Sequence, residues 1–198
     1  MKTTIYRVLI LMMFSSVIIA QDTLDKKPVF ILKTNLTLVV ASLLSTGRSG
    51  SLLAELGIKK RHSFQLIAAR RANVSASHKF IAGDVIPTYK YFLKKRKAYA
   101  GFYSGFYLRA HQRYVVSDLR THTTRSYLEY IQRRLGGGMV VGYQSYSKKR
   151  VVLDLLLGIG WARTVNKRVI NAFNTPYPTQ SADNFDGLLG LNIGYKFR

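Results

Sequence analysis

The last eleven residues, Leu188-Leu189-Gly190-Leu191-Asn192-Ile193-Gly194-Tyr195-Lys196-Phe197-Arg198, decide the predicted fold because their chemistry alternates from one position to the next. One set of alternate positions is apolar and ends in aromatic residues: Leu189, Leu191, Ile193, Tyr195 and Phe197. The other set is small or polar: Gly190, Asn192, Gly194, Lys196 and Arg198. A period of two is that of a β-strand, whose successive side chains point to opposite faces. The stretch therefore predicts a terminal strand with one face suited to an apolar medium.

Seven segments upstream alternate in a similar way, at residues 29–43, 51–58, 62–71, 80–93, 99–111, 137–146 and 151–163. In the last of these, for example, Leu153 and Leu155 flank Asp154. Eight strands is an even number, as bacterial outer-membrane barrels require. Several segments also reach the roughly nine to eleven residues that a strand needs to cross a bilayer.

The connections between these segments alternate between short and long. Three short ones follow the second, fourth and sixth segments and carry Lys59-Lys60-Arg61-His62, Lys94-Lys95-Arg96-Lys97 and Ser147-Lys148-Lys149-Arg150. The others are longer, up to 112–136 and 164–186. Short turns at one end and longer loops at the other are typical of an up-and-down barrel with both termini in the periplasm. We therefore expect an all-β fold over 29–198, a closed antiparallel eight-stranded transmembrane β-barrel.

The N-terminus predicts export from the cytoplasm. Lys2 and Arg7 precede an apolar run from 8 to 20, and Ala20 followed by Gln21 resembles a signal-peptidase site. The run is too short for a spanning helix, which needs about 20 apolar residues. We expect a cleavable signal peptide at 1–20 and a periplasmic lead-in at 21–28, with an uncleaved anchor as the alternative.

Composition narrows the possible partners. The chain has no cysteine, so disulfides, thiolate metal sites and a lipid-modified N-terminal cysteine are excluded. Its 31 Lys and Arg against 9 Asp and Glu give a net charge of +22. Removal of Lys2 and Arg7 with the signal leaves 29 basic residues and +20. Such a charge often indicates nucleic acid, but an exported protein meets acidic lipids and glycans first, so no nucleic-acid partner is expected.

The polar face of the segments indicates what fills the barrel. A lysine or arginine facing lipid costs about 2–4 kcal/mol at the bilayer midplane, so these side chains are expected to point inward. An eight-stranded barrel has room only for side chains, and inward glycines leave space for Tyr103 and Tyr107. We therefore predict no open pore and an interior polar network: Lys33, Asn35, Glu55, Asp84, Lys90, Arg109, Asp154 and Lys196. These residues would line the cavity of a soluble, lipocalin-like barrel poorly, although that fold remains the rival.

The basic turns have two interpretations. They are solvated turns, or they pair with phospholipid phosphates, at about 1 kcal/mol per residue. The predicted phosphate contacts are Lys59, Lys60, Arg61, Lys94, Lys95, Arg96, Lys97, Lys148, Lys149 and Arg150. The long third loop offers outward-facing guanidinium groups to lipopolysaccharide phosphates, or is simply a mobile, solvated loop. Its arginines are Arg113, Arg120, Arg125, Arg133 and Arg134, with His111 and His122 nearby.

Three short motifs carry a family resemblance: Lys33-Thr34-Asn35, Pro87-Thr88-Tyr89-Lys90-Tyr91-Phe92 and Gly194-Tyr195-Lys196-Phe197. With them the mature chain resembles a Bacteroidetes-type outer-membrane β-barrel family of unknown function, the DUF3575-like group. It is more loosely similar to barrels of the outer membrane protein A and X type. The resemblance implies the bacterial outer membrane, the barrel-assembly machinery as a partner, and Tyr195 and Phe197 as the C-terminal assembly signal. Arg198, not an aromatic, ends the chain, which departs from that signal.

No catalytic, metal or cofactor site is predicted. The pairs Ser75/His78 and Ser104/His111 are the conceivable hydrolytic pairs, but such catalysis also needs an orienting acid and an oxyanion hole. The glycines at 136–138 lack the Lys-Ser/Thr of a phosphate-binding loop. We expect a monomeric, non-enzymatic barrel with a structural or adhesive role carried by basic extracellular loops. The alternatives are a lipid A-modifying enzyme and a soluble secreted binder of acidic polymers.

Overall fold

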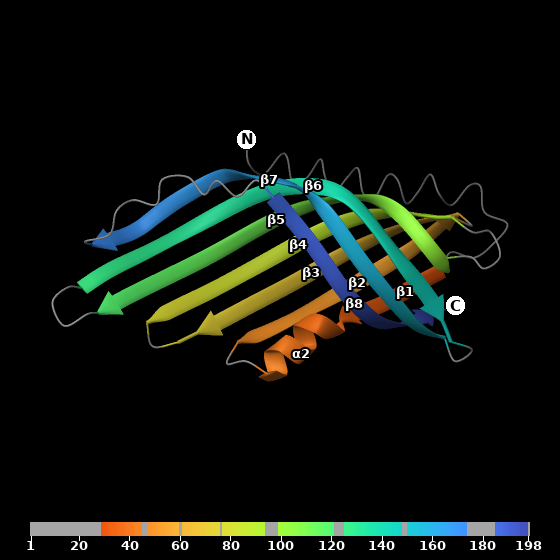
Figure 1. The fold of residues 1–198 in the computed structure, drawn as a ribbon, viewed down its shortest axis with the longest axis horizontal. Coiled ribbons are helices and arrows are strands. Elements are labelled where there is room, and N and C mark those ends of the chain that lie inside the picture. Colours follow the sequence, from red (N-terminus) through yellow and green to blue (C-terminus); the bar gives the residue numbers. More distant parts are fainter. Residues whose placement is uncertain are drawn as a thin grey trace.

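Eight antiparallel strands close into a ring in the computed structural model, each beside its neighbour in the chain, with β8 paired back to β1 (Figure 1). The structure describes residues 29–44, 47–59, 61–75, 77–93, 99–120, 125–147, 150–173 and 185–197. The strands are β1 (Val29–Asn35), β2 (Arg48–Lys59), β3 (His62–Val74), β4 (His78–Phe92), β5 (Gly101–Arg120), β6 (Arg125–Tyr146), β7 (Val151–Phe173) and β8 (Phe185–Phe197), and α2 (Leu36–Leu44) is a helix. The predicted all-β, up-and-down barrel is confirmed. The predicted signal peptide lies outside the described residues.

None of the helices within the described ranges is long and apolar enough to span a membrane.

The C-terminal strand closes the barrel, as its alternation predicted. In the β1–β8 pairing, Leu32 lies opposite Tyr195 and Phe30 opposite Phe197. The rings of Phe30 and Phe197 pack across this seam at an interplanar angle of 41°, with centroids 5.8 Å apart. Aromatic pairs across strands stabilise a sheet, so the seam is reinforced on its outer face.

The two faces of the barrel wall differ sharply in chemistry. The outer face carries large apolar side chains in the open, such as Ile159 at 63% and Trp161 at 69% exposure. The apolar residues inside are buried, among them Leu53, Phe92 and Leu156. We call the outer set the apolar belt: Leu52, Val85, Phe102, Phe106, Leu108, Leu135, Met139, Val141, Leu153, Leu155, Leu157, Ile159, Trp161, Phe185, Leu189 and Leu191. Soluble monomers rarely expose an apolar surface of this extent.

Aromatic side chains gather on the outer face near the short turns. Phe102 and Tyr143 lie 4.9 Å apart between centroids, and Tyr195 and Phe197 lie 5.2 Å apart. The predicted assembly signal, Tyr195 and Phe197, is therefore exposed and edge-packed at this rim. Recognition of these two residues by the assembly machinery stays a prediction.

The first predicted strand, 29–43, is wrong beyond Asn35. The chain turns there into α2, and the Asn35 Oδ1 atom accepts a hydrogen bond from the Leu38 backbone N at 3.2 Å. This is the N-cap contact that starts a helix. The apolar run of α2 misled the prediction because a short apolar run fits a strand or a buried helix equally well.

The long loops predicted at 112–136 and 164–186 are largely strand. β5, β6 and β7 run well past the apolar belt, and pairing of β5 with β6 continues to Arg120 and Arg125 (Figure 1). Beyond the belt the outward positions include exposed polar residues such as Gln112 and Arg133, so the apolar alternation that predicts a strand is lost. Gly138, within the predicted strand 137–146, lies in the ladder opposite Gly160.

Candidate functional site

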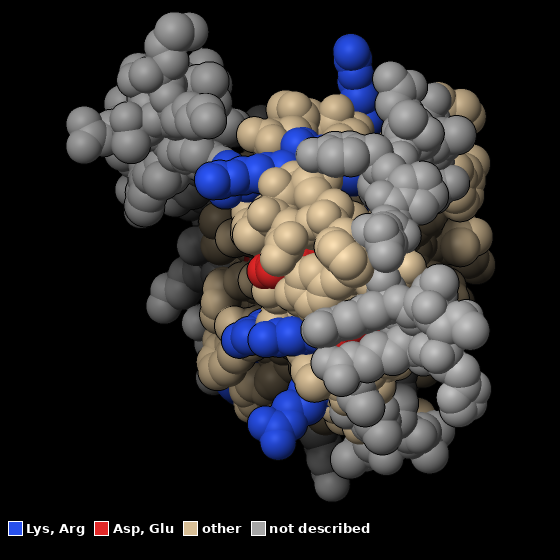
Figure 2. All heavy atoms as spheres, turned by 90° about the vertical axis from the view of Figure 1, so that its left-hand side faces the viewer, with Lys and Arg blue, Asp and Glu red and all other residues tan. Residues whose placement is uncertain are grey.

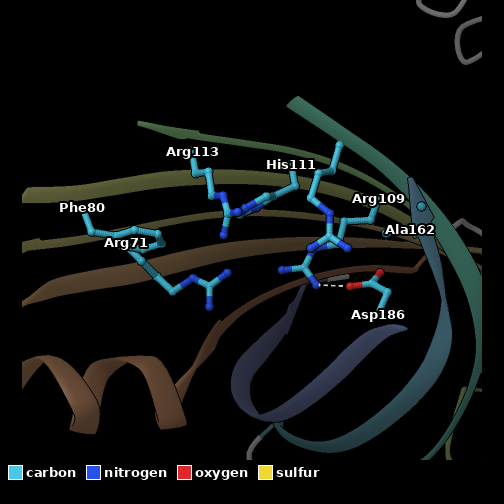
Figure 3. Close-up of a pocket in the computed structure, with 9 residues that line it drawn as sticks. Arg71, Phe80, Arg109, His111, Arg113, Ala162 and Asp186 are labelled. Atoms are coloured by element: carbon cyan, nitrogen blue, oxygen red, sulfur yellow. Dashed lines mark hydrogen bonds and ion pairs between the residues drawn. The ribbon is translucent and has the colours of Figure 1, made fainter. Parts of the chain in front are cut away.

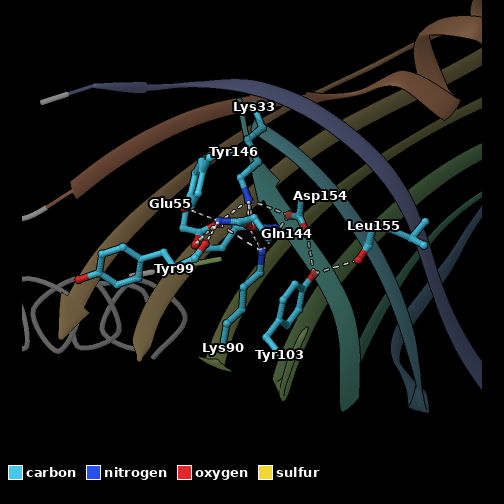
Figure 4. Close-up of polar contacts among 10 residues, drawn as sticks. Lys33, Glu55, Lys90, Tyr99, Tyr103, Gln144, Tyr146, Asp154 and Leu155 are labelled. Atoms are coloured by element: carbon cyan, nitrogen blue, oxygen red, sulfur yellow. Dashed lines mark hydrogen bonds and ion pairs between the residues drawn. The ribbon is translucent and has the colours of Figure 1, made fainter. Parts of the chain in front are cut away.

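Two lysines and two carboxylates lie inside the barrel, toward the strand ends at the short turns (Figure 4). Lys33 Nζ contacts a carboxylate oxygen of Glu55 and lies 2.7 Å from Asp154 Oδ2. Lys90 Nζ lies 3.2 Å from Glu55 Oε2 and 2.9 Å from Asp154 Oδ2. All four side chains are fully buried. We call this group the inner network; its two positive and two negative charges balance.

Neutral side chains complete the inner network. Gln65 and Gln144 accept hydrogen bonds from Lys33 Nζ through their Oε1 atoms, at 3.1 and 2.7 Å. The Tyr103 hydroxyl donates to Asp154 Oδ1 at 2.8 Å, and Lys90 Nζ lies 4.4 Å from the Tyr103 ring centroid. A buried charge is tolerable only when it is paired and hydrogen-bonded. The network meets that condition and fills the lumen.

A glycine makes room for the largest member of this group. A Cβ at Gly142 would clash with the ring and hydroxyl of Tyr103 and with the backbone O of Leu155. Tyr103 on β5 can reach Asp154 on β7 only because the intervening position on β6 has no side chain. The expectation that inward glycines make space for aromatic rings therefore holds at this position.

A second charged group surrounds the lumen near the end opposite the short turns (Figure 3). Asp84 accepts hydrogen bonds from Arg109 Nε at 2.8 Å and from Arg71 Nη2 at 3.1 Å. The Asp84 Oδ1 atom also lies 2.8 Å from His111 Nδ1. Arg109 also donates to Asp186 Oδ1 at 2.6 Å. We call this group, together with Arg113 and Arg134, the mouth cluster. Figure 2 looks onto this end of the molecule and shows basic side chains around acidic atoms.

The mouth cluster encloses a pocket of about 210 Å³. Its lining residues are Arg71, Phe80, Arg109, His111, Arg113, Arg134, Gly136, Ala162 and Asp186. The four arginines come from three strands, β3, β5 and β6, and point toward a common space. A second pocket of about 160 Å³ lies beside it, toward Leu38 of α2 and Asn192 of β8.

More positive charge lies above the mouth. The Arg113 guanidinium carbon and Lys167 Nζ lie 5.8 and 5.2 Å from the centroid of the Tyr130 ring. Desolvation by burial, and then the Arg113 charge, hold the pKa of Lys167 below its ordinary value. Both causes disfavour the charged form of this lysine.

The structure divides the eight predicted interior residues between several places. Lys33, Glu55, Lys90 and Asp154 meet in the inner network, and Asp84 and Arg109 meet in the mouth cluster. Asn35 caps α2, and Lys196 Nζ lies 5.1 Å from the Tyr146 ring centroid. The sequence did not predict Gln65, Gln144, Arg71 or Asp186 as members of these groups. It also did not predict the hydrogen bond from Tyr103 to Asp154. Gln65, Tyr103, Gln144 and Arg71 had only the signal of an inward position on an alternating segment, whereas Asp186 fell within the predicted loop at 164–186.

Most of the predicted phosphate contacts lie outside the described residues: Lys60, Lys94, Lys95, Arg96, Lys97, Lys148 and Lys149. The Lys59 side chain is likewise not described. Arg61 donates from Nη1 to the Tyr91 hydroxyl at 2.8 Å, and the Arg150 backbone N donates to the Ser147 O at 3.0 Å. Phosphate binding at these turns stays a prediction.

The conceivable hydrolytic pairs do not assemble. Ser104 alternates onto the outer face of β5, whereas His111 points inward to Asp84. The Ser75 hydroxyl contacts the backbone N and O of His78, both at 3.1 Å. Of the supposed third loop, Arg113 and Arg134 line the pocket and Arg133 is exposed. His122 and the side chains of Arg120 and Arg125 lie outside the description.

Comparison with known proteins gives one family and two similar structures. A family model described as a protein of unknown function (DUF3575) matches residues 7–196. The crystal structure of Neisserial surface protein A is similar with a TM-score of 0.45 and 17% identity, over 86% of this chain and 96% of that one. The N-terminal β-barrel domain of Pseudomonas aeruginosa OprF gives 0.34 and 10%, over 87% and 98%. No curated protein matches the chain.

Proposed function

The chain belongs to the DUF3575 family, and from that premise we propose that it is a non-enzymatic, integral β-barrel of the bacterial outer membrane. The observation that carries the proposal is the apolar belt around a closed barrel, with paired lysines and carboxylates buried inside it. In water such a belt would drive aggregation. In a bilayer the belt contacts the lipid acyl chains. Closure of the barrel leaves no unpaired strand edge within the hydrocarbon.

The role proposed for the barrel is structural or adhesive, exerted at its basic outer end. The filled lumen supports a role as anchor because paired lysines and carboxylates are fully buried within it. The ends of β5, β6 and β7 project past the belt and carry arginines such as Arg113 and Arg133. Under this proposal they meet acidic groups of the envelope or of a neighbouring surface. The arginines that the sequence assigned to the long third loop, such as Arg113 and Arg133, thus lie on the ends of β5 and β6.

Fractionation and one matched pair of variants test the membrane location. The expected result is recovery in the outer-membrane fraction with a heat-modifiable gel shift. Leu157→Arg places a charge in the middle of the belt and is expected to cost about 2–4 kcal/mol of barrel stability in bilayers. Val165→Arg, at an exposed site on β7 beyond the belt, is the control and is expected to change stability by less than about 0.5 kcal/mol.

Two results would contradict the proposal. One is recovery of the wild-type protein as a soluble periplasmic or secreted species. The other is equal behaviour of the Leu157 and Val165 variants, because a solvated belt would tolerate arginine at both sites.

A further inference from the structure

The described residues of the mouth cluster include more arginines than carboxylates. Four arginines line the pocket, and among the described residues Asp84 and Asp186 are the carboxylates that form ion pairs with Arg71 and Arg109.

Arg113 shows this excess most directly. Among the described residues it has no salt bridge, and its Nε atom is buried without a hydrogen-bond partner. Its neighbours include the Tyr130 ring and the cation of Lys167. A buried guanidinium nitrogen without an acceptor costs free energy, and a second cation beside it adds to that cost. An anion in the pocket would relieve both.

The pocket restricts the size and shape of that anion. About 210 Å³ is smaller than the roughly 300–1,000 Å³ usual for drug-sized ligands. It suits one tetrahedral anion with a small part of the group that carries it. Guanidinium groups from different walls can each donate two hydrogen bonds to phosphate oxygens, which a single carboxylate could not satisfy together. Phe80 provides an apolar wall beside Arg71 (Figure 3).

We infer that the mouth cluster is a binding site for a phosphate monoester, held by Arg71, Arg113 and Arg134. Arg109 is engaged by Asp84 and Asp186 and braces the floor of the site. The phosphate comes from a free sugar phosphate or from the headgroup of an outer-leaflet lipid. The inference names the ligand chemistry of the basic outer end, and it rests on the proposed function only for where the mouth faces.

Two pairs of adjacent arginines provide matched variants. Arg71 and Arg134 line the pocket, whereas Arg70 and Arg133 alternate onto the outer face and are exposed. The protein in detergent micelles is titrated calorimetrically with glucose 1-phosphate, and with glucose as the uncharged comparison. We expect binding of the phosphate ester only, weakened about tenfold or more in R71Q and in R134Q. R70Q and R133Q are expected to bind within about twofold of wild type.

Equal weakening in the outward and inward variants would overturn the inference, because it would show only an effect of net charge. Absence of binding by the wild type would also overturn it. A heat-modifiable gel shift establishes that each variant has closed. Should R71Q or R134Q fail to close, Arg113→Lys keeps the charge and removes the planar fork; unchanged affinity in that variant would then overturn the inference.

The source of the phosphate is distinguished with vesicles. Binding of the protein to vesicles containing lipid A, but not to vesicles containing dephosphorylated lipid A, would assign the site to a lipid headgroup. Binding of glucose 1-phosphate with no difference between the vesicles would assign it to a free ester. Calorimetry in micelles does not depend on membrane location, so failure of the inference and failure of the proposed function give different results.

Discussion

Asp154 is the residue on which the inner network depends most, because it accepts from both lysines and from Tyr103. Asp154→Asn removes one negative charge from a fully buried group of four and leaves a lysine without its counter-ion. Breaking a buried ion pair from one side costs about 3–5 kcal/mol. We expect a loss of this size in urea unfolding of the barrel in micelles.

The companion to that variant replaces a whole pair. Lys33→Met combined with Glu55→Leu removes one charge of each sign, which is often close to neutral for stability. The double variant should therefore unfold at a higher urea concentration than Asp154→Asn. The reverse order would show that hydrogen bonding, and not charge balance, dominates the lumen.

Tyr114 lies beyond the belt and gives a prediction about pH. Its hydroxyl donates to Glu129 Oε1 at 2.6 Å, and that hydrogen bond raises the pKa of Tyr114 to about 12. The folded state therefore holds this proton more tightly than the unfolded state, whose tyrosine pKa is about 10. The resulting stabilisation is present below pH of about 10 and is lost as pH rises through about 12.

The measurement is the tyrosinate absorbance of wild type minus that of Tyr114→Phe as the pH is raised. The difference in absorbance should titrate near pH 12. Tyr195→Phe is the comparison variant, because Tyr195 lies at the exposed rim and has no carboxylate partner among its described contacts. A difference curve centred at the ordinary tyrosine pKa would contradict the Glu129 contact.

At the scale of the element, β6 shows how glycine permits the lumen to be filled. Gly142→Ala would bring a methyl group against Tyr103 and the Leu155 backbone O, so Tyr103 must leave Asp154. We expect a loss of about 1–3 kcal/mol, as for overpacking of a tight core. Gly83→Ala on β4 is the control, because a Cβ there meets nothing within 4 Å. The measurement is the thermal unfolding of Gly142→Ala and of Gly83→Ala. Equal stability of the two variants would contradict the tight fit of Tyr103 against Gly142.

Strand order and the inward or outward direction of side chains could be predicted from the sequence wherever the chain crosses the belt. There the medium differs on the two faces, so alternation is strong, as in Leu153 to Leu157 around Asp154. It failed at α2, where one asparagine cap decided between helix and strand. It failed again for the ends of β5 and β6, because exposed polar residues such as Gln112 and Arg133 occupy outward positions there and remove the apolar alternation.

The candidate site was predictable only in part for a related reason. Alternation assigns Asp84 and Arg109 to the lumen, but it does not give their depth, which depends on the stagger between strands. The pairing of Asp84 with His111, and of His111 with Arg134, is set by that register. Arg113 and Arg134 were interpreted as loop residues, so the pocket they line could not be found.

The whole molecule should conduct no ions. Lys33, Glu55, Lys90 and Asp154 fill the lumen and are fully buried, and the nearby core adds Phe92 and Leu156. An ion would have to displace paired charges in a medium of low dielectric constant, which is costly. Planar bilayer recordings of the purified protein are expected to show no ohmic current. Stable, single-step conductance that persists after removal of contaminating porins would contradict the filled lumen.

The inner network also joins parts of the chain that are made at different times. Lys33 lies on β1, whereas Asp154 lies on β7, 121 positions later in the chain. Before β8 pairs with β1, Lys33 can contact Glu55 on the neighbouring β2, but it is not yet held beside Asp154. The seam and the ion pair of Lys33 with Asp154 therefore form in the same event, and opening the seam would separate that pair. The barrel should open all at once, and not strand by strand from its seam.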